Sequence, residues 1–308
     1  MSFRVLVVLF FLIIGFVSSF SYTIYLSKTT VEIIGDVIFV RVESGNFTNM
    51  FIRTSFNTNI LFPFYYLSGS SVSIIPIPFG VVSKNITIEI LTNGKVMYVD
   101  TLKLKVPKEK PKKVVKLNLS SESRSIITNV ERILRDREYI FKKISSINNY
   151  YFQGSFPRFS LPSTNRITSG FGIARRYSDG RVRYHNGIDF SALPDDNVYS
   201  VGDGIVIISG NFLANGQSIY IYHGYGIISS YFHLAEIFVK EGDFVRRGDI
   251  IGKIGGTGIV TAPHLHLGMY VWGIGGYVAV NPLNLIYLDV KNQDFISQLS
   301  NKKISDKF

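Results

Sequence analysis

The stretch Ala262-Pro263-His264-Leu265-His266-Leu267 holds two of the five histidines among the 308 residues of this chain. The other three are His185, His223 and His233, so the first 184 positions contain no histidine. Five histidines placed at random would not leave more than half of the chain empty. Their clustering indicates a functional site in the C-terminal half.

Histidine and aspartate side chains in this region indicate a metal site. Both are ligands of Zn²⁺, and catalytic zinc typically takes three protein ligands and leaves a fourth position for water. If Pro263 opens a strand, His264 and His266 lie on one face of it and can reach the same cavity. Spacing alone leaves open which three of the candidates hold the metal: His185, Asp189, His233, His264 and His266.

The spacing between His185 and Asp189 indicates how these two residues are presented. Asn186-Gly187 lies between them, and this pair is typical of turns and bulges. We therefore expect His185 and Asp189 on extended or irregular backbone, in contrast to the helix that carries a His-Glu-x-x-His site.

Four motifs, in this order, resemble those of the lysostaphin-type zinc metallopeptidases, which are endopeptidases that cut cell-wall peptidoglycan. They are His-x-Gly-x-Asp at 185–189, Tyr-x-His-Leu at 231–234, Gly-x-x-Val-x-x-Gly-x-x-Ile-Gly at 242–252 and Thr-x-Pro-His-Leu-His-Leu at 261–267. The resemblance implies one Zn²⁺ per chain, with His185, Asp189 and His266 as ligands. It also implies that His233 and His264 are catalytic histidines that do not bind the metal.

The same resemblance implies a catalytic domain over residues 167–290, built from antiparallel β-strands with a groove. Short strands separated by glycine turns between Val198 and Trp272 favour this architecture too. His223 ends one of these strands in Tyr222-His223-Gly224, and we assign it a structural role.

Nucleotide and carrier functions do not fit the glycine-rich segments of this half. Gly170-Phe171-Gly172 lacks the third glycine of a dinucleotide site. The segment from Gly248 to Lys253 is one residue short of a phosphate loop, and Ile254 stands where Ser or Thr is needed. A biotinyl or lipoyl carrier needs a lysine at its tight turn, where this chain has Gly255-Gly256-Thr257-Gly258.

Residues 1–21 have the pattern of an export signal. Arg4 precedes an apolar run from Val5 to Val17, which is shorter than the ~20 residues of a spanning helix. The alternative is an uncleaved membrane anchor, because Phe20 makes a poor cleavage site. We therefore expect export to the periplasm or cell envelope, with membrane contact only if this segment is retained.

The composition agrees with an exported protein that acts on an anionic polymer. The chain has no cysteine, so no thiol or disulfide is required. Its net charge of +11 favours contact with a cell wall, a membrane surface or nucleic acid. No basic helix or zinc-finger spacing supports nucleic acid, and no obligate protein partner is indicated.

Residues 22–105 read as a β-sandwich-like domain of short strands. The strands expected are Val37 to Val42, Met50 to Thr54, Asn59 to Tyr66, Val72 to Ile77, Ile86 to Leu91 and Val96 to Lys103. Thr92-Asn93-Gly94 predicts a two-residue hairpin. The predicted fold is therefore mainly β.

Residues 106–166 form the predicted connection between the two domains, and residues 291–308 a C-terminal tail. The connection begins with a lysine-rich linker at 106–113. Apolar residues then recur at steps of three, four and seven, which predicts one long amphipathic helix from about Ser123 to Asn148. Ser121 or Ser123 is the expected N-cap.

The function that these features predict is hydrolysis of peptide cross-links in peptidoglycan. By analogy with periplasmic enzymes that carry an N-terminal β domain and a helix, we favour D,D-endopeptidase activity by zinc-activated water over cleavage of glycine bridges. The alternatives are a non-catalytic wall-binding protein and an activator of a wall amidase.

Overall fold

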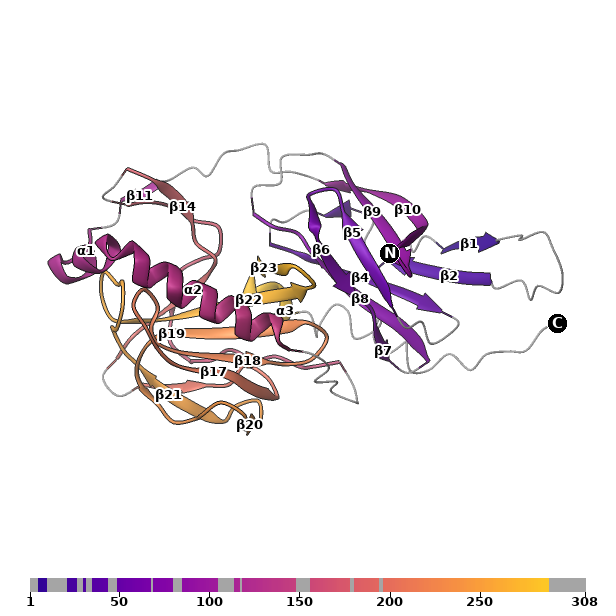
Figure 1. Cartoon of the computed structure of the whole chain (residues 1–308). Coiled ribbons are helices and arrows are strands. Elements are labelled where there is room, and N and C mark those ends of the chain that lie inside the picture. Colours follow the sequence, from indigo (N-terminus) through magenta and orange to yellow (C-terminus); the bar gives the residue numbers. More distant parts are fainter. Residues whose placement is uncertain are drawn as a thin grey trace.

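The chain folds into two β domains joined by two helices, as the computed structural model in Figure 1 shows. It describes residues 5–9, 21–26, 30–31, 35–43, 49–67, 69–79, 85–104, 114–116, 118–147, 156–177, 180–193 and 196–287. The predicted linker at 106–113 and tail at 291–308 lie outside the described residues.

The N-terminal domain is a sandwich of two five-stranded sheets, as predicted. One sheet has the order β1-β2-β4-β8-β7, with strands Val5–Leu9, Ser21–Leu26, Val37–Glu43, Ser70–Pro76 and Tyr65–Leu67. The other has the order β3-β10-β9-β5-β6, with strands Thr30–Val31, Lys95–Leu104, Asn85–Thr92, Met50–Thr54 and Asn57–Pro63. Buried Val, Ile and Phe side chains of both sheets fill the core, and β4 and β8 are buried along almost their whole length.

One strand of the sandwich was predicted wrongly. The run from Asn59 to Tyr66 forms two strands, β6 and β7, which belong to opposite sheets. Pro63 has no N–H to continue the ladder, and β6 ends there. The hairpin at Asn93-Gly94 is confirmed, since the two residues have φ values of 49° and 76°, as a type I′ turn requires.

The connecting helix is broken, so the prediction of one long helix is wrong. Helix α1 covers Ser121–Thr128 and α2 covers Val130–Ser145. Asn129 separates them, because its backbone N–H caps α1 while its side chain accepts a hydrogen bond from the N–H of Arg132 and so caps α2. The N-cap of α1 is Ser120, one residue before the predicted range.

The C-terminal domain is a ten-stranded antiparallel sheet, which agrees with the prediction. Its main path is β12-β15-β22-β19-β18-β17-β20, formed by Ile167–Ser169, Gly187–Ser191, His264–Gly273, Ile227–Ile237, Gly216–Tyr222, Gly204–Phe212 and Phe244–Val245. Strands β16 (Asn197–Tyr199), β21 (Ile250–Ile254) and β23 (Gly276–Val280) complete it.

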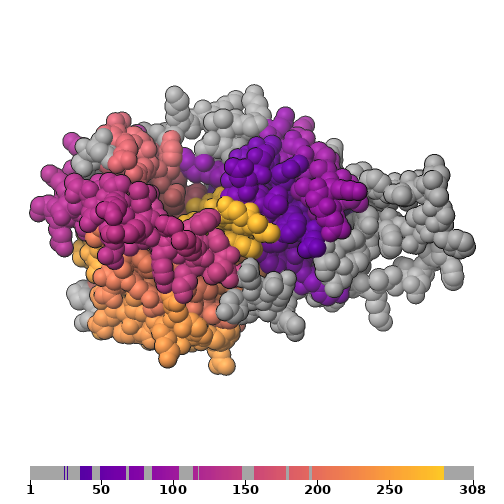
Figure 2. All heavy atoms as spheres, viewed as in Figure 1, coloured from indigo at the N-terminus to yellow at the C-terminus, as the bar shows by residue number. Residues whose placement is uncertain are grey.

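Two smaller elements complete the domain. A separate sheet of order β11-β13-β14 combines Val114–Lys116, Ala174–Arg176 and Val182–Tyr184. The short helix α3 spans Pro282–Ile286. Helix α2 packs on β17 through Ile140 and Ile144, and the helices cover one side of the C-terminal domain (Figure 2).

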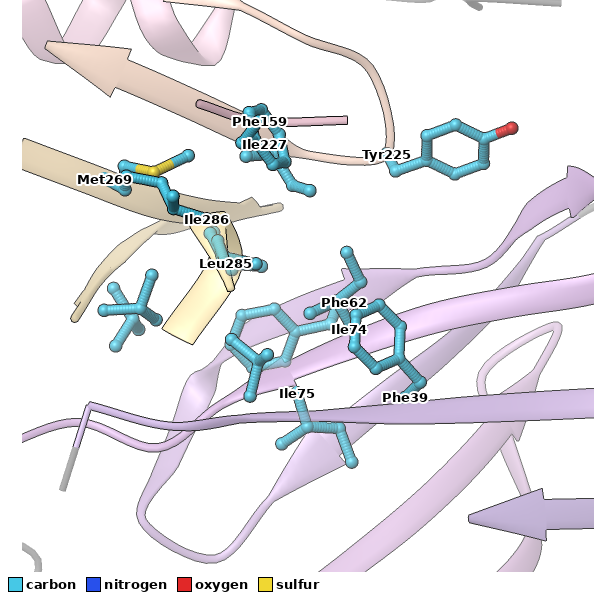
Figure 3. Close-up of a cluster of buried hydrophobic side chains, with 14 of the residues drawn as sticks. Phe39, Phe62, Ile74, Ile75, Phe159, Tyr225, Ile227, Met269, Leu285 and Ile286 are labelled. Carbon is cyan, nitrogen blue, oxygen red and sulfur yellow. The ribbon is translucent and has the colours of Figure 1, made fainter. Parts of the chain in front are cut away.

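The two domains share one hydrophobic core. Phe39, Phe62 and Ile74 of the sandwich face Leu285 and Ile286 of α3 in Figure 3. This continuity means that the sandwich and the C-terminal sheet pack together through a shared core.

Backbone pairing joins the two domains as well. Leu61 and Ile274 exchange backbone hydrogen bonds of 3.0 and 2.8 Å. Gly273 and Gly275 flank Ile274, and a Cβ atom at either position would meet the backbone or side chains of residues 59–61. The glycine-rich segment after β22 is therefore needed for the close approach of the domains.

The predicted export segment lies mostly outside the described residues. Val5–Leu9 forms strand β1, which pairs antiparallel with β2. Across the described parts of the chain, no helix is both long and apolar enough to cross a membrane. Export therefore stays a prediction.

We predict that Phe156→Ala destabilises both domains together. The buried Phe156 ring lies 5.4 Å from the ring of Phe39 and 5.3 Å from that of Tyr225, so it bridges the sandwich and the sheet. Loss of a buried Phe typically lowers the free energy of unfolding by about 3–5 kcal/mol. Urea unfolding followed by fluorescence measures it. Phe238→Ala, at a half-exposed ring, is the control and should change stability by less than about 1 kcal/mol.

Candidate active site

The register of two neighbouring strands brings the predicted site residues together. In the antiparallel pair β15 and β22, Asp189 lies directly opposite His266. His185 lies between β14 and β15, outside any helix, in agreement with the prediction of extended or irregular backbone. Gly187 leaves room for the His266 ring, since a Cβ there would lie 2.7 Å from it. The His-x-Gly-x-Asp motif thus needs glycine at its centre for steric reasons.

Three side-chain atoms converge at one buried point. His185 Nε2 lies 3.0 Å from His266 Nδ1, and Asp189 Oδ1 lies 3.0 Å from the former and 2.9 Å from the latter. The Nδ1 atom of His185 is 2.8 Å from the carbonyl oxygen of Gly170, so it carries the proton and leaves a lone pair on Nε2. These contacts direct three electron-rich atoms toward a common centre.

This cluster fits a metal ion. Atoms that bind one zinc ion at about 2.0–2.1 Å in tetrahedral geometry lie roughly 3.3 Å apart, close to the observed separations. Two imidazoles and a carboxylate are also a donor set that zinc favours. Among the described residues, His185, Asp189 and His266 are the group of three placed to hold such an ion.

The charge states of the cluster residues suit the binding of a metal ion near neutral pH. Burial raises the pKa of the Asp189 carboxyl group, but its close contacts with the His185 and His266 imidazoles outweigh this effect and hold the pKa below its usual range. Burial lowers the pKa of His266 to about 4, although Asp189 opposes this shift. A carboxylate and a neutral imidazole are the forms that bind metal.

His264 lies beside the cluster and opens strand β22. Its Nε2 atom is 3.7 Å from Asp189 Oδ1. Its Nδ1 donates to the carbonyl oxygen of Ala262 at 2.7 Å, which leaves Nε2 as a proton acceptor. Because the ring is partly open to solvent, this nitrogen can reach a water molecule near the cluster.

His233 faces His264, with ring centroids 4.8 Å apart. Its Nδ1 lies 2.8 Å from the carbonyl oxygen of Thr257, so its Nε2 is also unprotonated. Burial, together with the charges of His264 and His266, lowers the pKa of His233 to about 3. Its backbone has a φ of 66°, a strained conformation for a residue other than glycine.

One loop orients both of these histidines. Residues 255–263 supply the two carbonyl groups, from Thr257 and Ala262, that accept the Nδ1 protons. Ser123 of helix α1 fastens this loop, because its hydroxyl bonds the carbonyl oxygen of Val260 at 3.0 Å and the N–H of the same residue at 3.3 Å. No sequence pattern predicted this contact, which joins residues 137 positions apart.

His223 lies outside the cluster, in keeping with the structural role predicted for it. It is buried, with Nδ1 2.7 Å from the carbonyl oxygen of Asp203 and Nε2 2.7 Å from the Ser229 hydroxyl. Both ring nitrogens are thus satisfied within the protein.

Comparisons with known proteins agree with this geometry. Residues 183–282 match the model of Peptidase family M23. The peptidoglycan DD-endopeptidase ShyA of Vibrio cholerae is 39% identical over 140 residues, which cover 45% of this chain and 31% of that protein. The DD-carboxypeptidase/endopeptidase Mpg of Neisseria meningitidis is 36% identical over 120 residues, covering 39% and 27%. The chain thus matches about a third or less of the length of these relatives.

A solved structure extends the similarity in fold beyond the matched region. A crystal structure of a protein assigned to peptidase M23 from Pseudomonas aeruginosa superposes with a TM-score of 0.57 at 21% identity. The match covers 82% of this chain and 94% of the other. At this identity the likeness shows a shared fold.

We predict that His223→Asn makes stability less sensitive to acid. Burial lowers the pKa of His223 from 6.5 to about 4. Its contribution is therefore complete above pH 6.5 and is lost as the pH falls toward 4, because the unfolded chain binds the proton first. This lowering of the pKa corresponds to about 3 kcal/mol of stability. Urea unfolding at pH 7.5 and pH 4.5 should show a smaller loss in the variant. Equal losses in both proteins would contradict the assignment.

Proposed function

We propose that the chain, whose residues 183–282 match the model of Peptidase family M23, is a zinc-dependent metalloendopeptidase that hydrolyses peptide cross-links of cell-wall peptidoglycan. The observation that carries this proposal is the convergence of His185 Nε2, Asp189 Oδ1 and His266 Nδ1 at 2.9–3.0 Å. We assign these residues as the ligands of one Zn²⁺. Three protein ligands leave the fourth position that catalysis needs.

Bound zinc would supply a Lewis acid that polarises the scissile carbonyl and lowers the pKa of a water molecule to about 7. His264 is the general base in this proposal, because its Nε2 has a lone pair and lies beside Asp189 Oδ1. The proton that Nε2 accepts can then be donated to the leaving amine. The Nδ1 bond to Ala262 keeps the ring in the same orientation throughout.

His233 has a different role from the general base His264 in this proposal. It is more buried than His264, and its ring lies beside that of His264. In this proposal its unprotonated Nε2 accepts a hydrogen bond from an N–H of the bound peptide. The hydrogen bond from its Nδ1 to the Thr257 carbonyl oxygen sets the orientation of the ring.

The names of two relatives support the proposed substrate class. ShyA is named a peptidoglycan DD-endopeptidase and Mpg a DD-carboxypeptidase/endopeptidase. We propose D,D-endopeptidase cleavage of cross-links for this chain, in the cell envelope after export. The complete set of site residues argues against a wall-binding protein or amidase activator, since neither needs two histidines held as proton acceptors beside three converging ligands.

We predict that ligand and base variants separate metal binding from turnover. His266→Ala should lose both bound zinc and activity, because two protein ligands remain. His264→Ala should keep one zinc per chain and lose activity by roughly 100-fold or more, as expected for a general base. Zinc content by elemental analysis and peptide release measure the two effects. The His223→Asn variant is the control and should keep both. Equal zinc loss in the His264 and His266 variants would show that the roles are misassigned.

We predict that purified cross-linked muropeptide dimers are cut to monomers and that pentaglycine is not. Mass spectrometry identifies the bond, and a chelator should abolish the release. Cleavage of pentaglycine alone would overturn the D,D-endopeptidase assignment. Loss of only a terminal D-alanine from monomers would indicate a carboxypeptidase. Retention on sacculi without any release of peptides would support the wall-binding alternative.

A further inference from the structure

Each of the two oxygens of the Asp189 carboxylate has a separate partner. Oδ1 belongs to the ligand cluster, while Oδ2 accepts a hydrogen bond of 2.5 Å from Nη2 of Arg175. This ion pair is shielded from solvent, with side-chain exposures of 18% for Arg175 and 7% for Asp189. Charged hydrogen bonds in such surroundings are stronger than those on an open surface.

Arg175 also contacts the segment that orients His185. Its Nη2 donates to the Ser169 hydroxyl at 2.7 Å. That hydroxyl lies 3.4 Å from Nδ1 of His185, and the adjacent Gly170 carbonyl accepts the proton of the same nitrogen. One guanidinium group therefore lies behind two of the three proposed metal ligands.

We infer that Arg175 is a positioning residue of the metal centre, which keeps Asp189 a one-oxygen ligand by occupying Oδ2. The inference rests on the proposed metal site. A carboxylate can bind an ion through one oxygen or two. With Oδ2 held by Arg175, the second oxygen cannot turn toward the ion. A coordination position is thereby left for water, and partners of this kind typically orient ligands and tune affinity.

The strand that carries Arg175 pairs with a segment far upstream of residue 183, where the match to the family begins. Arg175 lies on β13, the central strand of the small sheet, opposite Val115 of β11 and Arg183 of β14. Strand β11 comes from the connection between the domains and pairs in parallel with β13. The connection thus holds the strand that carries Arg175, which makes it part of the support of the metal centre.

The test is metal binding by Arg175→Gln, Arg175→Lys and a matched control, Arg176→Gln. Arg176 is exposed on the same strand and, by strand alternation, points to the opposite face. Zinc affinity is measured by competition with a chromogenic chelator, without substrate. The visible spectrum of the Co²⁺-loaded protein reports coordination number, because four-coordinate Co²⁺ absorbs more strongly than five-coordinate Co²⁺.

We predict that Arg175→Gln lowers zinc affinity roughly 10- to 100-fold, the usual effect of losing a partner of a metal ligand. Its Co²⁺ absorption should also weaken as the freed Oδ2 joins the metal. Arg175→Lys should restore part of the affinity, since it keeps the charge next to Oδ2. The control should match the wild type in both measurements.

Three outcomes separate the claims. An Arg175→Gln protein that is folded and has wild-type affinity and an unchanged Co²⁺ spectrum overturns the role of Arg175. If this variant does not fold, Arg175→Met, which keeps the length of the side chain without its charge, decides by the same two measurements, and wild-type values in both overturn the inference. A wild-type protein that binds zinc but cuts no muropeptide overturns the proposed function and leaves this inference standing.

Discussion

The convergence of three lone pairs at one buried point is the constraint on which the rest of the site depends. His185 Nε2, Asp189 Oδ1 and His266 Nδ1 lie 2.9–3.0 Å apart. Without a cation between them, such electron-rich atoms would repel one another in a medium of low dielectric constant. Their positions are held by the pairing of β15 with β22, and a shift of one residue would turn His266 to the other face of the sheet. Strand register therefore determines whether the site exists.

Support for the site comes from outside the segment that matches the family. Ser169, Gly170 and Arg175 precede residue 183 and contact the ligand residues. Ser123 of α1 fastens the loop that orients His233 and His264, while β11 pairs with the strand that carries Arg175. The connection between the domains thus braces the metal-binding half and the proton-accepting half of the site through separate contacts. The connection therefore supports the site directly, whereas its sequence predicted only a linker and a helix.

The sequence predicted what depends on local pattern. The alternation of side chains along a strand placed His264 and His266 on the same face of β22. Asn93-Gly94 predicted the hairpin that joins β9 and β10 in the other domain. The contacts that depend on tertiary packing were missed. Nothing near Arg175 marks it as the partner of Asp189, because the pairing of β15 with β22 and of β13 with β14 brings them together. The break at Asn129 was not predicted, because the helical spacing of apolar residues continues from α1 into α2.

Strain and burial at the site are offset by the surrounding framework. His233 adopts a positive φ, and burial opposes protonation of both His233 and His266. Each of these features typically lowers stability by one to a few kcal/mol, so it persists only where neighbouring structure enforces it. Leu265 and Leu267 flank His266 and are fully buried, and the core they enter continues into the sandwich. The sandwich therefore extends the apolar core to which β22 contributes, and burial of this apolar surface favours the folded state.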